Sequence, residues 1–100
     1  MKMTQSHYDT LKAAFMTTLS AEVERLAGHQ DMPKSVKALV EHHAKAYAQE
    51  GLTERRMHFD LFWWVNRRAD LKDLMKGFYE YANDDHLYTA LKVIVKELQA

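Results

Sequence analysis

The sequence predicts an all-α protein, a compact bundle of four to five helices in a single helical domain that spans residues 1–100. Three observations predict this fold class. Apolar residues recur every three or four positions along most of the chain, which is the spacing of one helix face. No segment shows the sustained alternation of apolar and polar residues that is typical of strands. Proline occurs once and glycine three times, too rarely for a protein rich in loops and β-turns.

The first helix is predicted from an apolar stripe near the N-terminus. Its members are Tyr8, Leu11, Phe15, Leu19, Val23 and Leu26. We expect Ser6 to cap this helix, with Asp9 three residues later as the acid of a capping box. Gly28 is expected to end it, because glycine adopts a left-handed backbone conformation at helix ends without strain.

The second helix is expected to start around residues 31–34, with Pro33 in its first turn, where the missing N–H costs nothing. One stripe of this helix is predicted to contain Val36, Val40, His43 and Tyr47, with Leu39 beside them. Gly51 is expected to end the helix, and Leu52 to fold back on it as in a Schellman motif.

The third helix is expected to follow a cap at Thr53 and to contain residues 55–68, RRMHFDLFWWVNRR. Asp70, with a second aspartate three residues later, signals the start of a further helix. Because neither glycine nor proline separates the two, one long helix over residues 54–82 is an alternative that the sequence leaves open.

The last helix is expected after the polar segment 82–86, ANDDH, which is the last clear break in the chain. Asp84 is the best candidate for its cap, since a carboxylate accepts hydrogen bonds from the unpaired N–H groups of a first turn. The apolar stripe of this helix is predicted to contain Leu87, Leu91, Ile94 and Leu98.

Residues 55–68 hold four of the five arginines and four of the eleven aromatic residues. On a helix, one face would present Arg56, Asp60, Trp63 and Arg67. Two interpretations are open: a central helix whose aromatic residues are all core, or a helix that keeps this face for a partner. Large aromatic side chains commonly dominate cores, which favours the first interpretation, whereas Trp and Arg recur in binding hot spots, which favours the second. We expect Asp60 to pair with Arg56, and Arg67 to stack on the Trp63 ring.

Composition narrows the possible classes of function. The 14 basic and 14 acidic residues give a net charge of zero, which argues against non-specific nucleic-acid binding. A helical regulator that binds nucleic acid through Arg55/Arg56 and Arg67/Arg68 is the alternative function. The absence of cysteine excludes a disulfide framework and a thiol nucleophile. The N-terminus lacks the apolar core of a signal peptide, and no apolar run is long enough for a membrane span, so we expect a cytoplasmic protein.

No enzymatic activity, cofactor or metal site is expected. Glu54 and His58, four positions apart, could both reach a metal ion, but two ligands are fewer than a zinc site needs. His42 and His43 would point about 100° apart around a helix, so they cannot readily share an ion. We expect each histidine to be a surface or boundary residue. The sequence contains neither a phosphate-binding glycine loop nor a nucleophile motif.

The C-terminal half resembles a group of short proteins encoded by tailed phages and prophages. The resemblance rests on an Arg, an aromatic–Asp pair, and a tyrosine-bearing segment that leads into Asn-Asp-x-His-x-x-Thr-Ala-Leu. The matching positions are Arg56, Phe59, Asp60, Tyr81, Asn83, Asp84, His86, Leu87, Thr89, Ala90 and Leu91. The resemblance implies a small mobile-element protein that acts in a bacterial host cytoplasm.

Small phage proteins without catalytic motifs usually act by binding a host protein. The expected function is therefore that of a phage-type accessory protein that binds and inhibits a host protein complex by steric docking, for example a bacterial defence system such as CRISPR-Cas. Its predicted partner-binding residues are Arg56, Asp60, Trp63 and Arg67, with Tyr79 and Tyr81 as secondary candidates. A second copy of the chain could instead cover the apolar surface of the third helix, which would give a homodimer.

Overall fold

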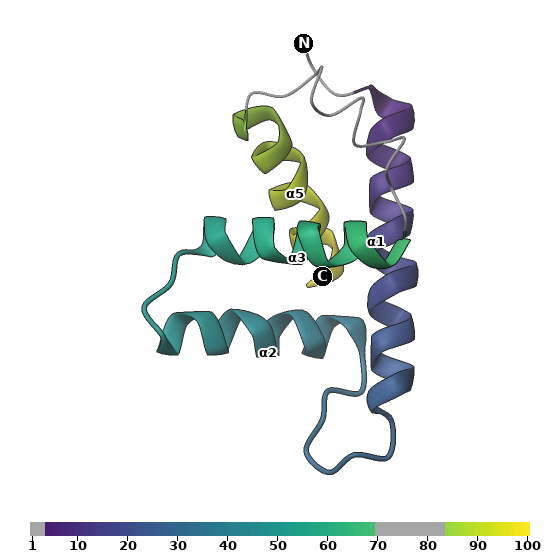
Figure 1. The fold of residues 1–100 in the computed structure, drawn as a ribbon, viewed down its shortest axis with the longest axis vertical. Coiled ribbons are helices and arrows are strands. Elements are labelled where there is room, and N and C mark those ends of the chain that lie inside the picture. Colours follow the sequence, from purple (N-terminus) through teal and green to yellow (C-terminus); the bar gives the residue numbers. More distant parts are fainter. Residues whose placement is uncertain (1–3, 70–83) are drawn as a thin grey trace.

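The computed structural model describes residues 4–69 and 84–100, and within them it contains four α-helices and no strand (Figure 1). The helices are α1 (Gln5–Leu26), α2 (Val36–Gln49), α3 (Glu54–Ala69) and α5 (Asp84–Leu98). This confirms the all-α class. The further helix expected from Asp70, and the alternative of one helix over residues 54–82, fall on residues outside the described part of the chain.

The four described helices form a bundle in which each helix contacts the other three. α2 and α3 run side by side in opposite directions, and α1 crosses their ends (Figure 1). α5 packs against α3, partly behind it in this view. The side-by-side placement of α2 and α3 matters for function, because it brings residues of two sequence segments to one surface.

The start of α1 differs from the prediction. Thr4, not Ser6, is the N-cap, and its hydroxyl oxygen accepts a hydrogen bond of 3.1 Å from the His7 N–H. The helix therefore begins two residues earlier than expected. Thr4 offers the same kind of capping oxygen as Ser6 and allows a longer helix. Asp9 accepts a hydrogen bond from the Gln5 side chain at 2.9 Å and closes no capping box with Ser6. At the other end, the φ of 89° at Gly28 confirms the left-handed stop.

The start of α2 is also corrected. The N-cap is Ser35, whose side-chain oxygen accepts a hydrogen bond of 3.1 Å from the Ala38 N–H. Pro33 consequently lies before the helix and not in its first turn. The backbone of Asp31 is left-handed, with a φ of 63°, and a left-handed residue cannot belong to a right-handed helix. Residues 31–34 therefore form part of the connection between α1 and α2.

The end of α2 confirms the predicted Schellman motif. The Leu52 N–H donates to the Tyr47 carbonyl at 2.9 Å, and the Gly51 N–H donates to the Ala48 carbonyl at 3.1 Å. Gly51 has a φ of 72°. These two bonds occupy carbonyl groups that would otherwise have no partner at the helix end. They also reverse the chain, so that α3 returns along α2.

The predicted cap of α3 is confirmed, since the Thr53 hydroxyl oxygen accepts a hydrogen bond of 3.1 Å from the Arg56 N–H. α5 begins at Asp84, inside the predicted break at residues 82–86. The side chain of Asp84 falls outside the described part of the chain, so its role as a cap stays a prediction.

The core takes residues from all four described helices, as the apolar stripes predict. α1 contributes Leu11, Phe15 and Leu19, α2 contributes Leu39 and Val40, α3 contributes Met57, Leu61, Phe62 and Val65, and α5 contributes Leu87, Leu91, Ile94, Val95 and Leu98. The stripe of the last helix is buried throughout, whereas the second helix turns His43 and Tyr47 only partly inward. Those two side chains reach the edge of the core, where α2 meets α3.

Candidate protein-docking site

The outer face of α3 carries the four residues predicted to bind a partner. Arg56, Asp60, Trp63 and Arg67 are all exposed. Trp63 keeps 44% of its surface accessible, whereas Phe62, its neighbour in the chain, is completely buried. The interpretation in which every aromatic residue of this helix belongs to the core is therefore wrong for Trp63. Trp64 is half-buried and packs against the core.

Asp60 links the two helices that form this surface. Its Oδ2 atom accepts a hydrogen bond of 2.6 Å from the Tyr47 hydroxyl of α2, and lies 3.8 Å from Nε of Arg56. The Arg56–Asp60 pair was expected from their spacing, but the contact with Tyr47 was not. This hydrogen bond, together with desolvation and repulsion by the carboxylate, raises the pKa of Tyr47 to about 12. One oxygen of the Asp60 carboxylate is therefore already engaged within the protein.

The predicted stacking of Arg67 on Trp63 is replaced by a contact one residue further along the chain. The guanidinium of Arg68 lies over the Trp64 ring, 4.1 Å from its centroid, while Trp63 makes an edge contact with Phe62 at 5.4 Å between centroids. Within residues 4–69 and 84–100, the structure gives Arg67 neither a hydrogen bond nor an ion pair. Its guanidinium is thus available to an incoming group.

An open pocket of about 350 Å³ lies between α2 and α3. Its lining comprises His43 and Tyr47 from α2, and Asp60, Leu61, Trp63, Trp64 and Arg67 from α3. Burial and the neighbouring His42 lower the pKa of His43, although Glu22 acts in the opposite direction. The sequence predicted that His43 and Tyr47 share one stripe of the second helix, but it gave no signal that they border a pocket. The pocket exists only because two helices lie side by side.

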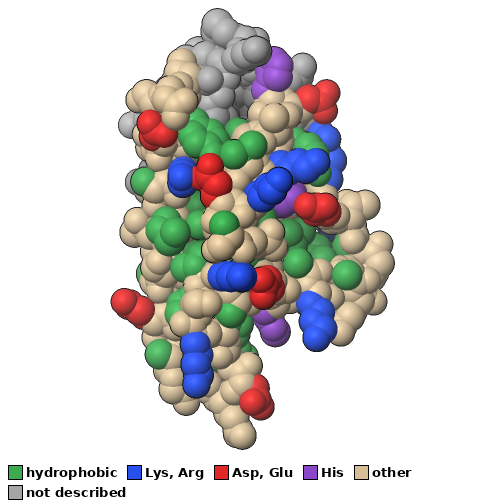
Figure 2. Space-filling view, turned by 180° about the vertical axis from the view of Figure 1, so that it is seen from behind, with side chains coloured by type: hydrophobic (Ala, Val, Ile, Leu, Met, Phe, Trp, Pro, Cys, Tyr) green, Lys and Arg blue, Asp and Glu red, His purple; other side chains and the backbone are tan. Residues whose placement is uncertain are grey.

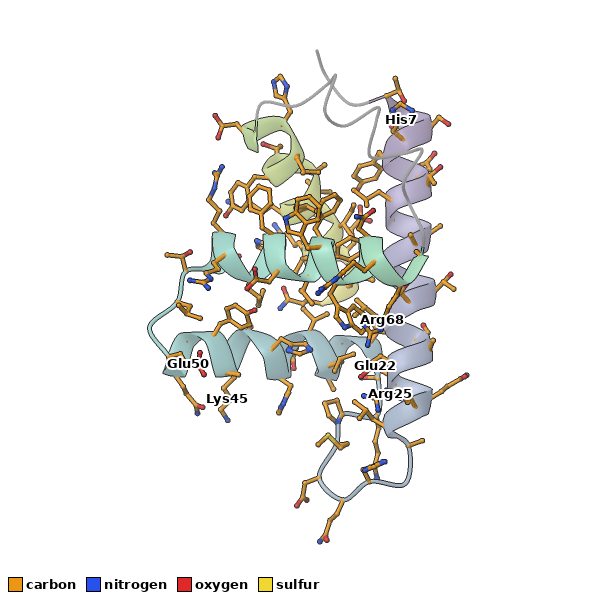
Figure 3. All side chains as sticks on the ribbon, in the orientation of Figure 1. His7, Glu22, Arg25, Lys45, Glu50 and Arg68 are labelled. Atoms are coloured by element: carbon orange, nitrogen blue, oxygen red, sulfur yellow. The ribbon has the colours of Figure 1, made fainter. Side chains whose placement is uncertain are left out.

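The four arginines of α3 do not form one basic surface. Arg55 lies 3.4 Å from the Asp85 carboxylate and 4.6 Å from the centre of the Tyr88 ring, so it is held against α5. Arg68 covers Trp64 near Glu22, where α1 crosses the end of α3 (Figure 3). On the opposite side of the molecule from the view of Figure 1, basic and acidic side chains are also interspersed (Figure 2). The two arginines of each pair, Arg55/Arg56 and Arg67/Arg68, therefore lie in different surroundings.

His58 corrects the expectation that each histidine lies at the surface or boundary. It is buried in the core, with 1% of its surface accessible, and its Nδ1 atom has no hydrogen-bond partner among the described residues. Its Nε2 atom lies 3.9 Å from Oε1 of Glu54. Burial lowers the pKa of His58, with Glu54 opposing and Lys92 reinforcing the shift. Within the described ranges, no three His, Asp or Glu side chains are grouped so that they could hold a metal ion.

Tyr79 and Tyr81, the secondary candidates for partner binding, lie outside the described residues. None of the helices in the described part of the chain is both long and apolar enough to cross a membrane.

Fold and site together define an all-α protein with a tryptophan and two arginines displayed beside an open interhelical pocket. A comparison with protein-family models finds no match, and comparisons with curated proteins and with solved structures find no similar protein either.

Proposed function

We propose that this chain is a small accessory protein that binds a host protein complex and blocks it by occupying its surface, without catalysis. The observation that supports this proposal is the exposed Trp63 on α3, with Arg56 and Arg67 on the same face. An indole that remains 44% exposed leaves a large apolar surface in water in the monomer. At an interface, the same side chain would bring a large apolar contact area into a desolvated centre.

The proposed partner is a protein complex of a bacterial host, and a defence system such as CRISPR-Cas is the first to test. This choice comes from the resemblance of residues 56–91 to phage and prophage proteins, and it is an analogy. The proposed binding face consists of Arg56, Asp60, Trp63 and Arg67. Truncating a hot-spot side chain costs about 2 kcal/mol or more of binding free energy, which corresponds to a loss of affinity of roughly thirtyfold.

The test is an interference assay in cells that carry a CRISPR-Cas system and are challenged with a targeted phage. The wild-type protein is expected to protect the phage, and Trp63→Ala and Arg67→Glu are expected to abolish protection. Both side chains are exposed, so helical circular dichroism should be preserved and the melting temperature should fall less than in a variant of a fully buried residue. Lys45→Glu is the matched control, because Lys45 is exposed on α2 and projects away from α3 (Figure 3). Full protection by both α3 variants would show that this face is not the binding surface.

A stability control separates a lost interface from a lost fold. Phe62 is completely buried, so Phe62→Ala should cost about 3–5 kcal/mol of unfolding free energy. Trp63→Ala, one residue away, should cost less, about 2 kcal/mol, because 44% of this side chain is already exposed. Urea denaturation measures both. If Trp63→Ala destabilises as strongly as Phe62→Ala, Trp63 serves the core and the proposal loses its support.

A further inference from the structure

The pocket between α2 and α3 is lined by both apolar and charged side chains. Leu61, Trp63 and Trp64 supply apolar surface, and Arg67 lies at the same opening. The volume of about 350 Å³ falls at the lower end of the range for ligand pockets, roughly 300–1,000 Å³. It can accept one large apolar side chain together with a polar group beside it.

The charge available to an incoming group at this pocket is positive. Asp60 is the acidic residue of the lining, but its Oδ2 atom already accepts the Tyr47 hydroxyl at 2.6 Å and lies 3.8 Å from Arg56. Arg67 has no hydrogen bond or ion pair with any described residue. An incoming carboxylate would give that guanidinium a charge-assisted, bidentate partner. An incoming amine could reach the second oxygen of Asp60, but it would also meet the positive charges of Arg56, 3.8 Å from Oδ2, and of Arg67 in the same lining.

The arrangement fits a protein segment better than a nucleic acid. Nucleic-acid affinity depends on neutralising several phosphates along a strand, yet Arg55 is held by Asp85 and Arg68 lies over Trp64. Beyond the pocket, the exposed face of α3 continues from Arg67 back to Arg56. Arg56 and Arg67 are eleven positions apart, which corresponds to roughly 16 Å of helix, a length suited to a short peptide.

We infer that the α2–α3 pocket binds an acidic segment of the partner protein, with an apolar side chain against Trp63 and Trp64 and a neighbouring carboxylate on Arg67. This inference rests on the proposed function and specifies the chemistry of the partner. It also assigns separate roles within the site: the indoles bind the apolar group, and Arg67 selects for negative charge.

Three probes test the inference on the full chain. They are a capped Glu-Phe-Glu tripeptide, a capped Lys-Phe-Lys tripeptide and a single-stranded DNA oligonucleotide of mixed sequence. Binding is followed through the indole N–H signals of Trp63 and Trp64 in nitrogen–proton correlation spectra, which Trp63→Phe assigns. The acidic peptide is expected to shift both signals with an affinity at least about tenfold higher than that of the basic peptide. The oligonucleotide is expected to leave them unchanged.

Matched variants identify the residue that selects the charge. Arg67→Gln should lower the affinity for the acidic peptide about tenfold and leave the basic peptide unaffected. Lys45→Gln removes one positive charge from α2 outside the pocket and should change neither. Helical circular dichroism should be preserved in both variants, because both side chains are exposed.

Several outcomes would overturn the inference. These are equal binding of the two peptides, no binding of either, an acidic-peptide affinity that Arg67→Gln leaves unchanged, or indole shifts caused by the oligonucleotide and not by the peptide. If the acidic peptide does not bind while Trp63→Ala still abolishes phage protection, the inference fails and the proposed function stands. If the peptide binds but Trp63→Ala leaves protection intact, the proposed function fails instead.

Discussion

At the scale of single residues, Tyr47 and Asp60 show how one hydrogen bond changes the chemistry of a side chain. The Tyr47 hydroxyl donates to the Asp60 carboxylate at 2.6 Å, and its pKa rises from the ordinary 10.0 to about 12. A tyrosine with a raised pKa in the folded state contributes stability that is fully present below its unfolded pKa. That contribution is lost as the pH rises from about 10 towards 12.

The titration of Tyr47 gives a prediction for the intact protein. Subtracting the tyrosinate absorbance of Tyr47→Phe from that of the wild type isolates the titration of Tyr47. This titration should occur near pH 12. Asp60→Asn should return that ionisation towards pH 10, because an amide keeps a hydrogen-bond acceptor but removes the negative charge. If the Tyr47 ionisation in Asp60→Asn stays as late as in the wild type, the carboxylate is not the cause of the shift.

Phe62 and Trp63 also differ at this scale, in how much of each side chain is buried. The two are adjacent in sequence and similar in character, but Phe62 is fully buried and Trp63 is 44% exposed. Side chains one position apart point about 100° apart around a helix, so a helix packed on several sides can still leave one face open. The proposed binding role of Trp63 depends on this difference.

At the scale of elements, the turn between α2 and α3 positions the site. Gly51 has a φ of 72°, and an added Cβ would meet no atom within 4 Å. A substitution there is therefore limited by backbone strain and not by space. Because Gly51 reverses the chain, it determines that α3 runs back along α2 and that Tyr47 can reach Asp60.

We predict that Gly51→Ala lowers the unfolding free energy by about 1–2 kcal/mol, the cost of a left-handed conformation for an L-residue. Glu50→Ala is the control, since Glu50 has an ordinary φ of −86° and is exposed. Urea denaturation of the two variants measures the difference. Equal stability of both would show that the turn does not require glycine.

At the scale of the whole molecule, the buried His58 couples the fold to pH. The imidazole contacts the Tyr88 ring at 5.7 Å between centroids, and the charged groups that act on it are Glu54 and Lys92. Burial lowers its folded-state pKa below the ordinary 6.5, so the unfolded chain binds the proton more readily. Stability from this group is present above pH 6.5 and is lost as the pH falls through 6.5 towards the folded-state pKa.

We therefore predict that the urea midpoint of the wild type falls as the pH is lowered from about 8 to 5. His58→Leu should flatten this dependence, because an apolar side chain in the core binds no proton. His43, whose pKa is also lowered mainly by burial, should account for part of the remaining slope, and His43→Gln serves as the comparison. An unchanged slope in His58→Leu would contradict the assignment.

Helix caps and stops that depend on a few neighbouring residues could be predicted from the sequence. Thr53, Gly28 and Gly51 were identified because caps and left-handed stops are local chemistry. Prediction failed at Ser6 and Pro33, because more than one local arrangement was available there. Thr4 and Ser35 offered competing capping oxygens, and the intrinsic differences between such caps are small compared with the packing free energy of whole helices.

The sequence left open whether the Trp63 face is core or surface, and the structure decided it. What the sequence determined by itself were the all-α class and the stripes that form the core. These follow from helical periodicity and from the burial of apolar surface, which act within each segment. Only the tertiary structure decided that Tyr47 reaches Asp60, that His58 is buried and that a pocket opens beside Arg67. Each of these requires side chains from separate helices to meet, and the distances between such residues are set by how the helices pack and not by their positions in the chain.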